Sequence, residues 1–287
     1  MTNDILTQIH NRLPTLSKGQ RKIAEYILSS YEKAAFQTAL ALGKNVQVSE
    51  STVVRFACEL GYEGYPQMQK ALQEMVRSRL TAVQRIEVSA PSVSGDELLT
   101  EVMHADMERI RKSMELTTPE MFHGAVDALM DAKRIYVIGL RSASALASFL
   151  GYYLNYMFDH IRLITSGSDS EVFDQIIHIS PKDAVIAMSF PRYSSATVKA
   201  MRYARTVGAT TVAITDRASS PLCHSAEYVL LAQSDMVSLV DSLVAPMSLI
   251  NALLAALSRK REKELQNTLS QLETVWEQNH VYEKIHD

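Results

Sequence analysis

The sequence predicts two domains of different class, an all-helical domain followed by a doubly wound α/β domain with a parallel sheet. Apolar residues recur at helical spacing across residues 1–80, where no strand pattern occurs. From Lys133 onward, short apolar runs alternate with helical segments, as is typical of strands in a parallel sheet. Between these patterns, residues 81–95 include Ser89-Ala-Pro-Ser-Val-Ser-Gly95 and predict a linker. The second domain would then span 96–287.

Five short helices are expected in the N-terminal domain, each marked by an apolar stripe or a terminating residue. They are a stripe at Ile5, Leu6, Ile9 and Leu13, a helix capped by Ser17, a run over Ala34–Leu42 that stops at Gly43, a helix capped by Ser49 and closed by Gly61, and a last helix ending near Leu80. In the fourth helix we expect Val53, Val54 and Phe56 to point inward, and Cys58 to serve packing.

The second domain is expected to begin with a helix and to continue as alternating strands and helices. The first helix runs from Asp96 to about Leu116, with Leu98, Leu99, Val102, Met103 and Ile110 on its apolar side. The expected strands cover 134–139, 161–164, 184–188, 210–215 and 227–231, the helices 142–158, 195–206, 238–258 and 260–283. The last two helices, with Trp276, are candidates for a subunit interface, although the first of them could equally belong to the core.

Composition excludes several classes of protein. The chain has 287 residues, a net charge of −3 and 47% hydrophobic residues, which is ordinary for a globular protein. Its two cysteines are too few for a disulfide framework or a cysteine-rich zinc site, and its eight histidines lack metal-ligand spacing. No run approaches the roughly 18 apolar residues of a membrane span. We therefore expect a cytoplasmic protein without a bound metal or cofactor.

Charge is divided unevenly between the two halves of the chain. Residues 1–85 carry 11 Lys+Arg against 7 Asp+Glu, whereas residues 86–287 carry 18 against 25. A basic segment joined to an acidic one is expected where one part of a protein meets nucleic acid and the other does not. Statistical scatter remains an alternative explanation for a surplus of this size.

Residues 40–61 have the pattern of a helix-turn-helix. The second helix follows Ser49 and presents Ser51 and Thr52 in its first turn, with Arg55 one turn on. Hydroxyls at a helix N-terminus can bond to phosphates and base edges, and an arginine can reach a guanine or a phosphate. The pattern favours binding to double-stranded DNA. The alternative is a helical packing module whose hydroxyl cluster is a cap and whose Arg55 is a surface charge.

Three strings in this region resemble the N-terminal domain of the RpiR family, bacterial transcription regulators with a C-terminal sugar isomerase (SIS) domain. They are Ser17-Lys-Gly-Gln-Arg-Lys-Ile-Ala-Glu-Tyr-Ile-Leu28, Val48-Ser-Glu-Ser-Thr-Val-Val-Arg-Phe56 and Leu60-Gly-Tyr-Glu-Gly-Tyr65. The resemblance covers nearly the whole chain, because the α/β pattern after Lys133 also fits a SIS domain. It implies that the recognition helix carries Ser49, Ser51, Thr52 and Arg55, and that its approach carries Lys44 and Asn45.

Two loops of the second domain are candidates for a ligand site. In an open α/β sheet, ligands bind beyond the carboxyl ends of the strands, and both loops follow a predicted strand. The first carries Gly139, Arg141, Ser142 and Ser144, and the second carries Ser189, Arg192, Ser194, Ser195 and Thr197. Because each loop leads into a helix, its N–H and hydroxyl groups can hold a phosphate or a carboxylate. The serines could also be simple helix caps.

The loops depart from the SIS domains that bind sugar phosphates, which usually read G-x-G-x-S and S-x-S-G-x-T. Arg141 takes the place of the second glycine and Ala143 that of the serine, while Pro191 and Arg192 replace a Ser-Gly pair. Guanidinium groups at these positions offer bidentate donors to an anion, such as a phosphorylated or carboxylate-bearing sugar derivative. Alternatively, both arginines pair with acidic residues and hold the pocket shut.

Together these features predict a transcription regulator, not an enzyme, in which a small anionic metabolite controls binding to operator DNA. One recognition helix covers few base pairs, so we expect a homodimer or homotetramer that reads paired half-sites. The competing function is a sugar-phosphate isomerase with a helical accessory domain. His178, His224 and Glu171 are weak candidates for its proton carriers, and no catalytic residue is assigned.

Overall fold

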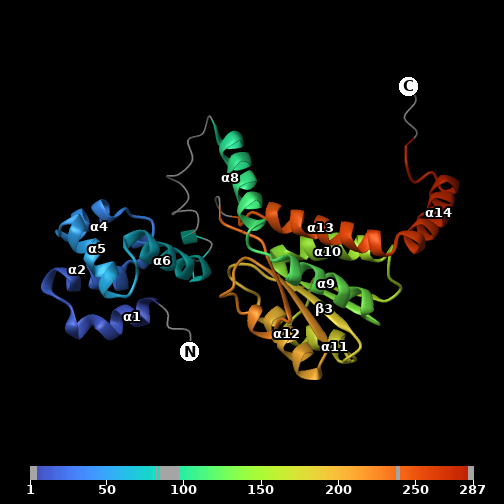
Figure 1. The fold of residues 1–287 in the computed structure, drawn as a ribbon, viewed down its shortest axis with the longest axis horizontal. Helices are drawn as coiled ribbons and strands as arrows, with labels where there is room; N and C mark the ends of the chain where they lie inside the picture. The colour runs from blue at the N-terminus through green and yellow to red at the C-terminus, as the bar shows by residue number, and fades with distance from the viewer. Residues whose placement is uncertain (1–4, 80, 82, 85–96, 237–239, 284–287) are drawn as a thin grey trace. The chain divides into compact units, whose positions relative to one another are not determined.

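A computed structural model describes residues 5–79, 81, 83–84, 97–236 and 240–283. The chain divides into two compact units, residues 1–98 with 236–240 and residues 99–235 with 241–287 (Figure 1). Most of the predicted linker at 81–95 lies outside the described residues. Each unit has an apolar core of its own.

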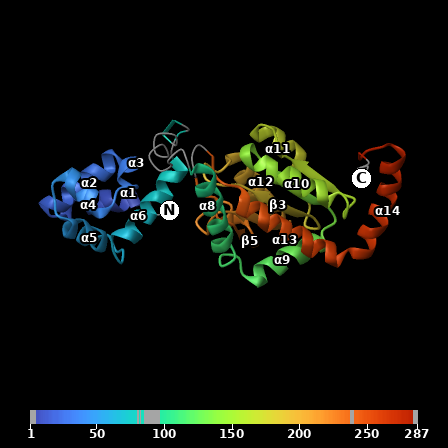
Figure 2. The ribbon, with the colours of Figure 1, turned by 90° about the horizontal axis from the view of Figure 1, so that it is seen from above.

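The first unit is a cluster of short helices around one apolar core (Figures 1 and 2). Its elements are α1 (Ile5–Arg12), a 3-10 turn η1 (Leu13–Thr15), α2 (Lys18–Ser29), α3 (Tyr31–Ala34), α4 (Ala39–Val46), α5 (Glu50–Glu59) and α6 (Tyr65–Arg79). Ile9, Ile23 and Phe56 are fully buried at its centre. The periodicity of the sequence therefore identifies the core of this unit.

The predicted third helix, Ala34–Leu42 ending at Gly43, is wrong. The segment instead ends one helix at Ala34 and begins another at Ala39, where the Thr38 hydroxyl accepts the Ala41 N–H at 3.2 Å. The second helix continues through Gly43, and a Cβ there would lie 2.9 Å from the carbonyl oxygen of Val48. Gly43 thus allows a close approach of two backbones, while Gln47, at a φ of 57°, ends the helix.

The described residues of the second unit form a five-stranded parallel sheet in the order β2-β1-β3-β4-β5. The strands are β1 (Ile135–Gly139), β2 (Ile161–Ile164), β3 (Ala184–Met188), β4 (Thr210–Thr215) and β5 (Tyr228–Leu231). Helices α9 (Pro119–Asp131), α10 (Ser144–Leu154) and α13 (Val244–Lys260) cover one face, and α11 (Asp169–Ile176) and α12 (Ser195–Val207) cover the other (Figure 1). This is the predicted doubly wound arrangement.

Two helices of this unit have no counterpart in the sequence prediction, α9 and α11. Helix α11 is short and starts in a serine-rich loop that has the composition of a turn. Helix α9 has 13 residues and begins after the Thr118 cap. The predicted helix from Asp96 to about Leu116 is α8 (Leu98–Ser113), with Asp96 outside the described residues, and its Leu99 and Met103 are exposed.

The two C-terminal helices differ in burial. Helix α13 belongs to the core through Ile250, Leu253 and Leu257, whereas none of the residues of α14 (Glu262–Gln278), all of them described, is fully buried. In the described part of the chain, no helix is long and apolar enough to cross a membrane.

Candidate functional site

The N-terminus of α5 is organised by Ser49. Its hydroxyl oxygen accepts the Thr52 N–H at 3.3 Å and lies 2.9 Å from the hydroxyl oxygens of both Ser51 and Thr52. Ser49 is therefore the cap that fixes the start of the helix, and its contacts hold the neighbouring hydroxyls in place. Helix α4 packs against α5, and Lys44 and Asn45 are exposed in its last turn.

One face of α5 is exposed and carries side chains of mixed chemistry. Ser51, Val54, Arg55 and Cys58 follow one another at the spacing of a single helical face, and all four are exposed. The prediction that Val54 points inward is wrong, and Cys58, expected to serve packing, is exposed as well. Val53, Phe56 and Ala57 fill the inward positions, so the adjacent Val54 points outward with 38% of its surface exposed.

In the second unit, a cavity of about 660 Å³ opens beyond the carboxyl ends of β1, β2 and β3. It is lined by Leu140, Arg141, Ser144, Thr165, Ser166, Gly167, Ser168, Asp169, Arg192, Tyr193, Ser194, Ser195 and Ala196. Three loops that each lead toward a helix N-terminus meet there. Backbone N–H groups at such termini favour an anion.

The structure brings five of the predicted residues together in this cavity: Arg141, Ser144, Arg192, Ser194 and Ser195. The other four do not line it. Gly139 allows close packing, because a Cβ there would lie 2.6 Å from the Ala143 carbonyl oxygen. Ser189 is buried and accepts the Ser194 N–H at 3.0 Å, Thr197 is buried in α12, and Ser142 is exposed away from the cavity.

The third loop, Thr165–Asp169 between β2 and α11, was not predicted. Ser168 caps α11 by accepting the Glu171 N–H, and Glu171 accepts the Ser168 N–H at 2.6 Å. The signal was present in the sequence, because Thr-Ser-Gly-Ser-Asp directly follows an apolar strand. The other two cavity loops were predicted from the same pattern, a polar segment that directly follows an apolar strand.

Arg141 and Arg192 have backbone angles that favour glycine, with φ of 58° and 65°. These are the two positions where an arginine replaces a glycine of the usual SIS pattern, so the loops keep the conformation despite the substitution. Neither guanidinium has an ion pair with a described residue. Asp169, the acidic residue of the cavity wall, is paired with Lys199 outside it. The cavity therefore presents two cations to solvent.

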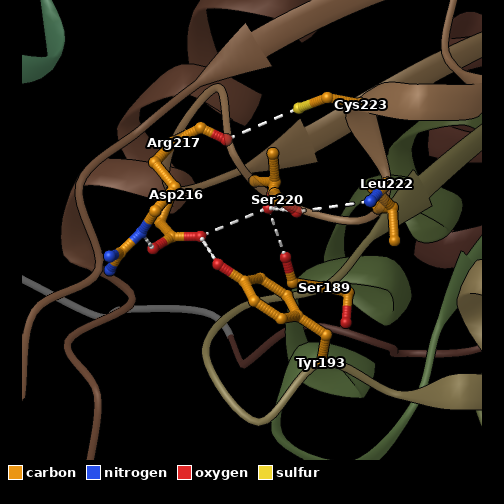
Figure 3. A network of polar contacts seen from close by, with 8 residues as sticks. Ser189, Tyr193, Asp216, Arg217, Ser220, Leu222 and Cys223 are labelled. Carbon is orange, nitrogen blue, oxygen red and sulfur yellow. Dashed lines mark hydrogen bonds and ion pairs between the residues drawn. The ribbon is translucent and has the colours of Figure 1, made fainter. Parts of the chain in front are cut away.

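A buried polar network anchors the loop that carries Arg192 (Figure 3). Tyr193 points toward Asp216 at the end of β4 and donates its hydroxyl to that carboxylate at 2.7 Å, while Arg217 pairs with the other carboxylate oxygen. Burial, and then the charge of Asp216, raise the pKa of Tyr193. The Thr215 hydroxyl donates to the Ser189 carbonyl oxygen at 2.7 Å and ties the same loop to β4. Asp216 is thus a support of the loop and does not line the cavity.

Residues suited to isomerase chemistry are not gathered in this cavity. His178 and His224 do not line it, and hydrogen bonds from Ser168 lower the pKa of Glu171, which keeps it ionised. Among the described residues, no group of three or more His, Cys, Asp and Glu side chains could hold a metal ion. The described walls of the cavity carry two arginines and no histidine that could serve as a proton carrier.

Comparison with known proteins gives matches to both domains. Residues 3–79 match a helix-turn-helix domain of the rpiR family, and residues 128–256 match a SIS domain. The transcriptional regulator HexR of Escherichia coli is 26% identical over 278 residues, which is 94% of this chain and 93% of HexR. HexR of Pseudomonas aeruginosa is 24% identical over 276 residues and 94% of each chain.

Two solved structures are similar in fold. The sugar isomerase domain of an RpiR transcription factor from Sphaerobacter thermophilus is 29% identical, with a TM-score of 0.60, over 62% of this chain and 99% of that one. The NanR protein of Vibrio vulnificus, complexed with ManNAc-6P, is 21% identical with a TM-score of 0.59 and covers 95% of this chain and 97% of its own.

A helix-turn-helix unit joined to a SIS unit with a polar, cation-bearing cavity defines a DNA-binding regulator that senses a small molecule. This chain belongs to the RpiR family of transcriptional regulators.

Proposed function

We propose that the exposed face of α5 enters the major groove of operator DNA. Ser51, Thr52 and Arg55 contact base edges or phosphates, Lys44 and Asn45 contact the backbone from the last turn of α4, and Ser49 holds the N-terminus in shape. Two observations support this assignment. All of these residues are exposed except Thr52, which is half-buried, and Arg55 has no ion partner among the described residues.

The cavity beyond the sheet binds the effector, which is a sugar phosphate or a carboxylate-bearing sugar derivative. The observation that carries this proposal is the pair of arginines at left-handed backbone positions, exposed at the cavity and without an acidic partner in the described chain. Ser144, Ser194 and Ser195 supply hydroxyls beside them, and Ser166 and Ser168 add the third loop. The complex of NanR with ManNAc-6P supports a phosphorylated sugar as the ligand class.

The working form is a cytoplasmic homodimer or homotetramer, because paired half-sites must be read by paired recognition helices. Helix α14 contributes to the subunit interface through the half-buried seam of Leu265, Leu269, Leu272 and Trp276, since α13 is already used by the core. Effector binding favours one arrangement of the DNA-binding units over another.

Calorimetric titration with a panel of sugar phosphates and sugar acids tests the effector site. We expect binding by at least one anion, and a loss of at least tenfold in affinity in both Arg141→Ala and Arg192→Ala. Ser142→Ala, which alters an exposed serine outside the cavity, is the matched control and should bind normally. Unchanged affinity in both arginine variants would move the site elsewhere.

A further inference from the structure

The exposed face of α5 contains one aliphatic side chain among polar ones. Val54 is 38% exposed and lies one helical turn after Ser51 and directly before Arg55. Because the side chain is β-branched, it has few rotamers and presents its two methyl groups as a fixed surface. The methyl groups of Val54 therefore have a fixed position relative to any molecule that binds this face.

The fold of the unit does not account for Val54. The inward side of α5 is filled by Val53, Phe56 and Ala57, all fully buried, and Val54 is not among the residues that pack on that core. Valine also has a lower helix propensity than alanine, so the position gains nothing for the helix itself. The Val54 side chain is therefore available for contact with a molecule that binds this face.

Base edges in the major groove offer one apolar group, the C5-methyl of thymine. We propose that Val54 contacts a thymine methyl in each operator half-site and makes the protein prefer thymine at that position. This inference rests on the proposed role of α5 as the recognition helix. Ser51 and Arg55, on either side of Val54, make the polar contacts, and Val54 adds discrimination that hydrogen bonds to phosphates cannot supply.

The test replaces thymine with deoxyuracil, which removes the methyl group and leaves base pairing unchanged. An operator is first selected from random duplexes with the full-length protein, and each thymine is then replaced in turn. Fluorescence anisotropy measures the affinity at fixed salt. We expect one thymine per half-site at which the replacement weakens binding about fourfold, the effect of one methyl group removed from a contact.

Three variants assign the effect to Val54. In Val54→Ala, affinity for the thymine operator should fall, and the penalty for deoxyuracil at that position should vanish. Arg55→Ala should bind all sequences more weakly yet keep the deoxyuracil penalty. Val83→Ala, the same change at an exposed valine outside α5, should resemble the wild type. Val54→Ala should not lower the thermal stability, because the side chain is outside the core and alanine has the higher helix propensity.

The outcomes separate the inference from the proposed function. If Val54→Ala keeps the full deoxyuracil penalty, or if no thymine is sensitive in the wild type, Val54 does not read a methyl group. If Arg55→Ala also leaves affinity unchanged, the assignment of α5 as the recognition helix fails with it. A general weakening in Val54→Ala at every sequence would show a backbone contact in place of a base contact, and would likewise overturn the proposal.

Discussion

At the scale of single residues, the ligand cavity is distinguished by arginines that occupy glycine conformations. Arg141 and Arg192 adopt φ of 58° and 65°, in a region that costs a residue with a Cβ roughly 1 kcal/mol or more. A protein under no other constraint would keep glycine at both positions. The strain supports the proposed role of the guanidinium groups in binding an anionic effector.

Substitutions at Arg192 separate that strain from binding. Arg192→Gly and Arg192→Ala should lose effector affinity to the same extent, because both remove the guanidinium. Only Arg192→Gly relieves the backbone, so urea unfolding should show it to be more stable than Arg192→Ala by about 1 kcal/mol. Equal stability of the two variants would mean that the loop relaxes to another conformation.

The hydroxyl of Tyr193 should give a measurable pH dependence of stability. Its pKa is raised in the folded protein, so the neutral form stabilises the fold below about pH 10, the unfolded value, and that contribution is lost as the pH rises further. Tyr193→Phe should therefore be less stable at pH 7 by about 1–2 kcal/mol, since the Asp216 carboxylate loses a donor. The difference should narrow above pH 10 in urea unfolding. A constant difference from pH 7 to 11 would contradict the assignment.

At the scale of elements, the turn between α4 and α5 depends on the absence of a side chain at Gly43. Glycine inside a helix normally costs up to 1 kcal/mol relative to alanine, so Gly43→Ala would stabilise an unconstrained helix. Here a Cβ would lie 2.9 Å from the Val48 carbonyl oxygen, a backbone atom that can move only with the turn. The recognition helix is positioned by this contact between two backbones.

Gly43→Ala should consequently destabilise the first unit by about 1–3 kcal/mol and weaken DNA binding. Gly64→Ala is the matched control, because a Cβ there would meet its nearest atom at an ordinary 3.7 Å. Thermal unfolding followed by circular dichroism measures both variants. A Gly43→Ala protein as stable as the wild type would show that the α4–α5 turn adjusts freely.

The sequence allowed most helices of the first unit, the five strands of the described sheet and two of the three cavity loops to be predicted, because these depend on local periodicity and on the position of loops after strands. It did not predict α9 and α11. It could not place Val54, since two adjacent valines in a helix leave open which one points inward until neighbouring helices are packed. Gly43 was misread because a helix stop and a close backbone approach use the same residue. The Thr165–Asp169 loop was overlooked because it carries no arginine to draw attention to it.

At the scale of the whole molecule, the two parts of the sequence on either side of Arg85 have opposite net charge. Residues 1–85 have an excess of 4 positive charges and residues 86–287 an excess of 7 negative charges, which sum to −3. Operator binding should therefore weaken steeply with salt, while the acidic second unit does not add to affinity for phosphates. The central claim that joins these units is that a ligand in the SIS cavity changes the affinity of the helix-turn-helix unit for DNA.

The most direct test of that claim measures operator affinity by fluorescence anisotropy, with and without an anion shown by calorimetry to bind. In the wild type, saturation with the anion should change DNA affinity at least fivefold. In the Arg141→Ala, Arg192→Ala double variant, DNA affinity should match the ligand-free wild type and should not respond to the same anion. A response that persists in the double variant, or an anion that binds the wild type without changing DNA affinity, would contradict the claim.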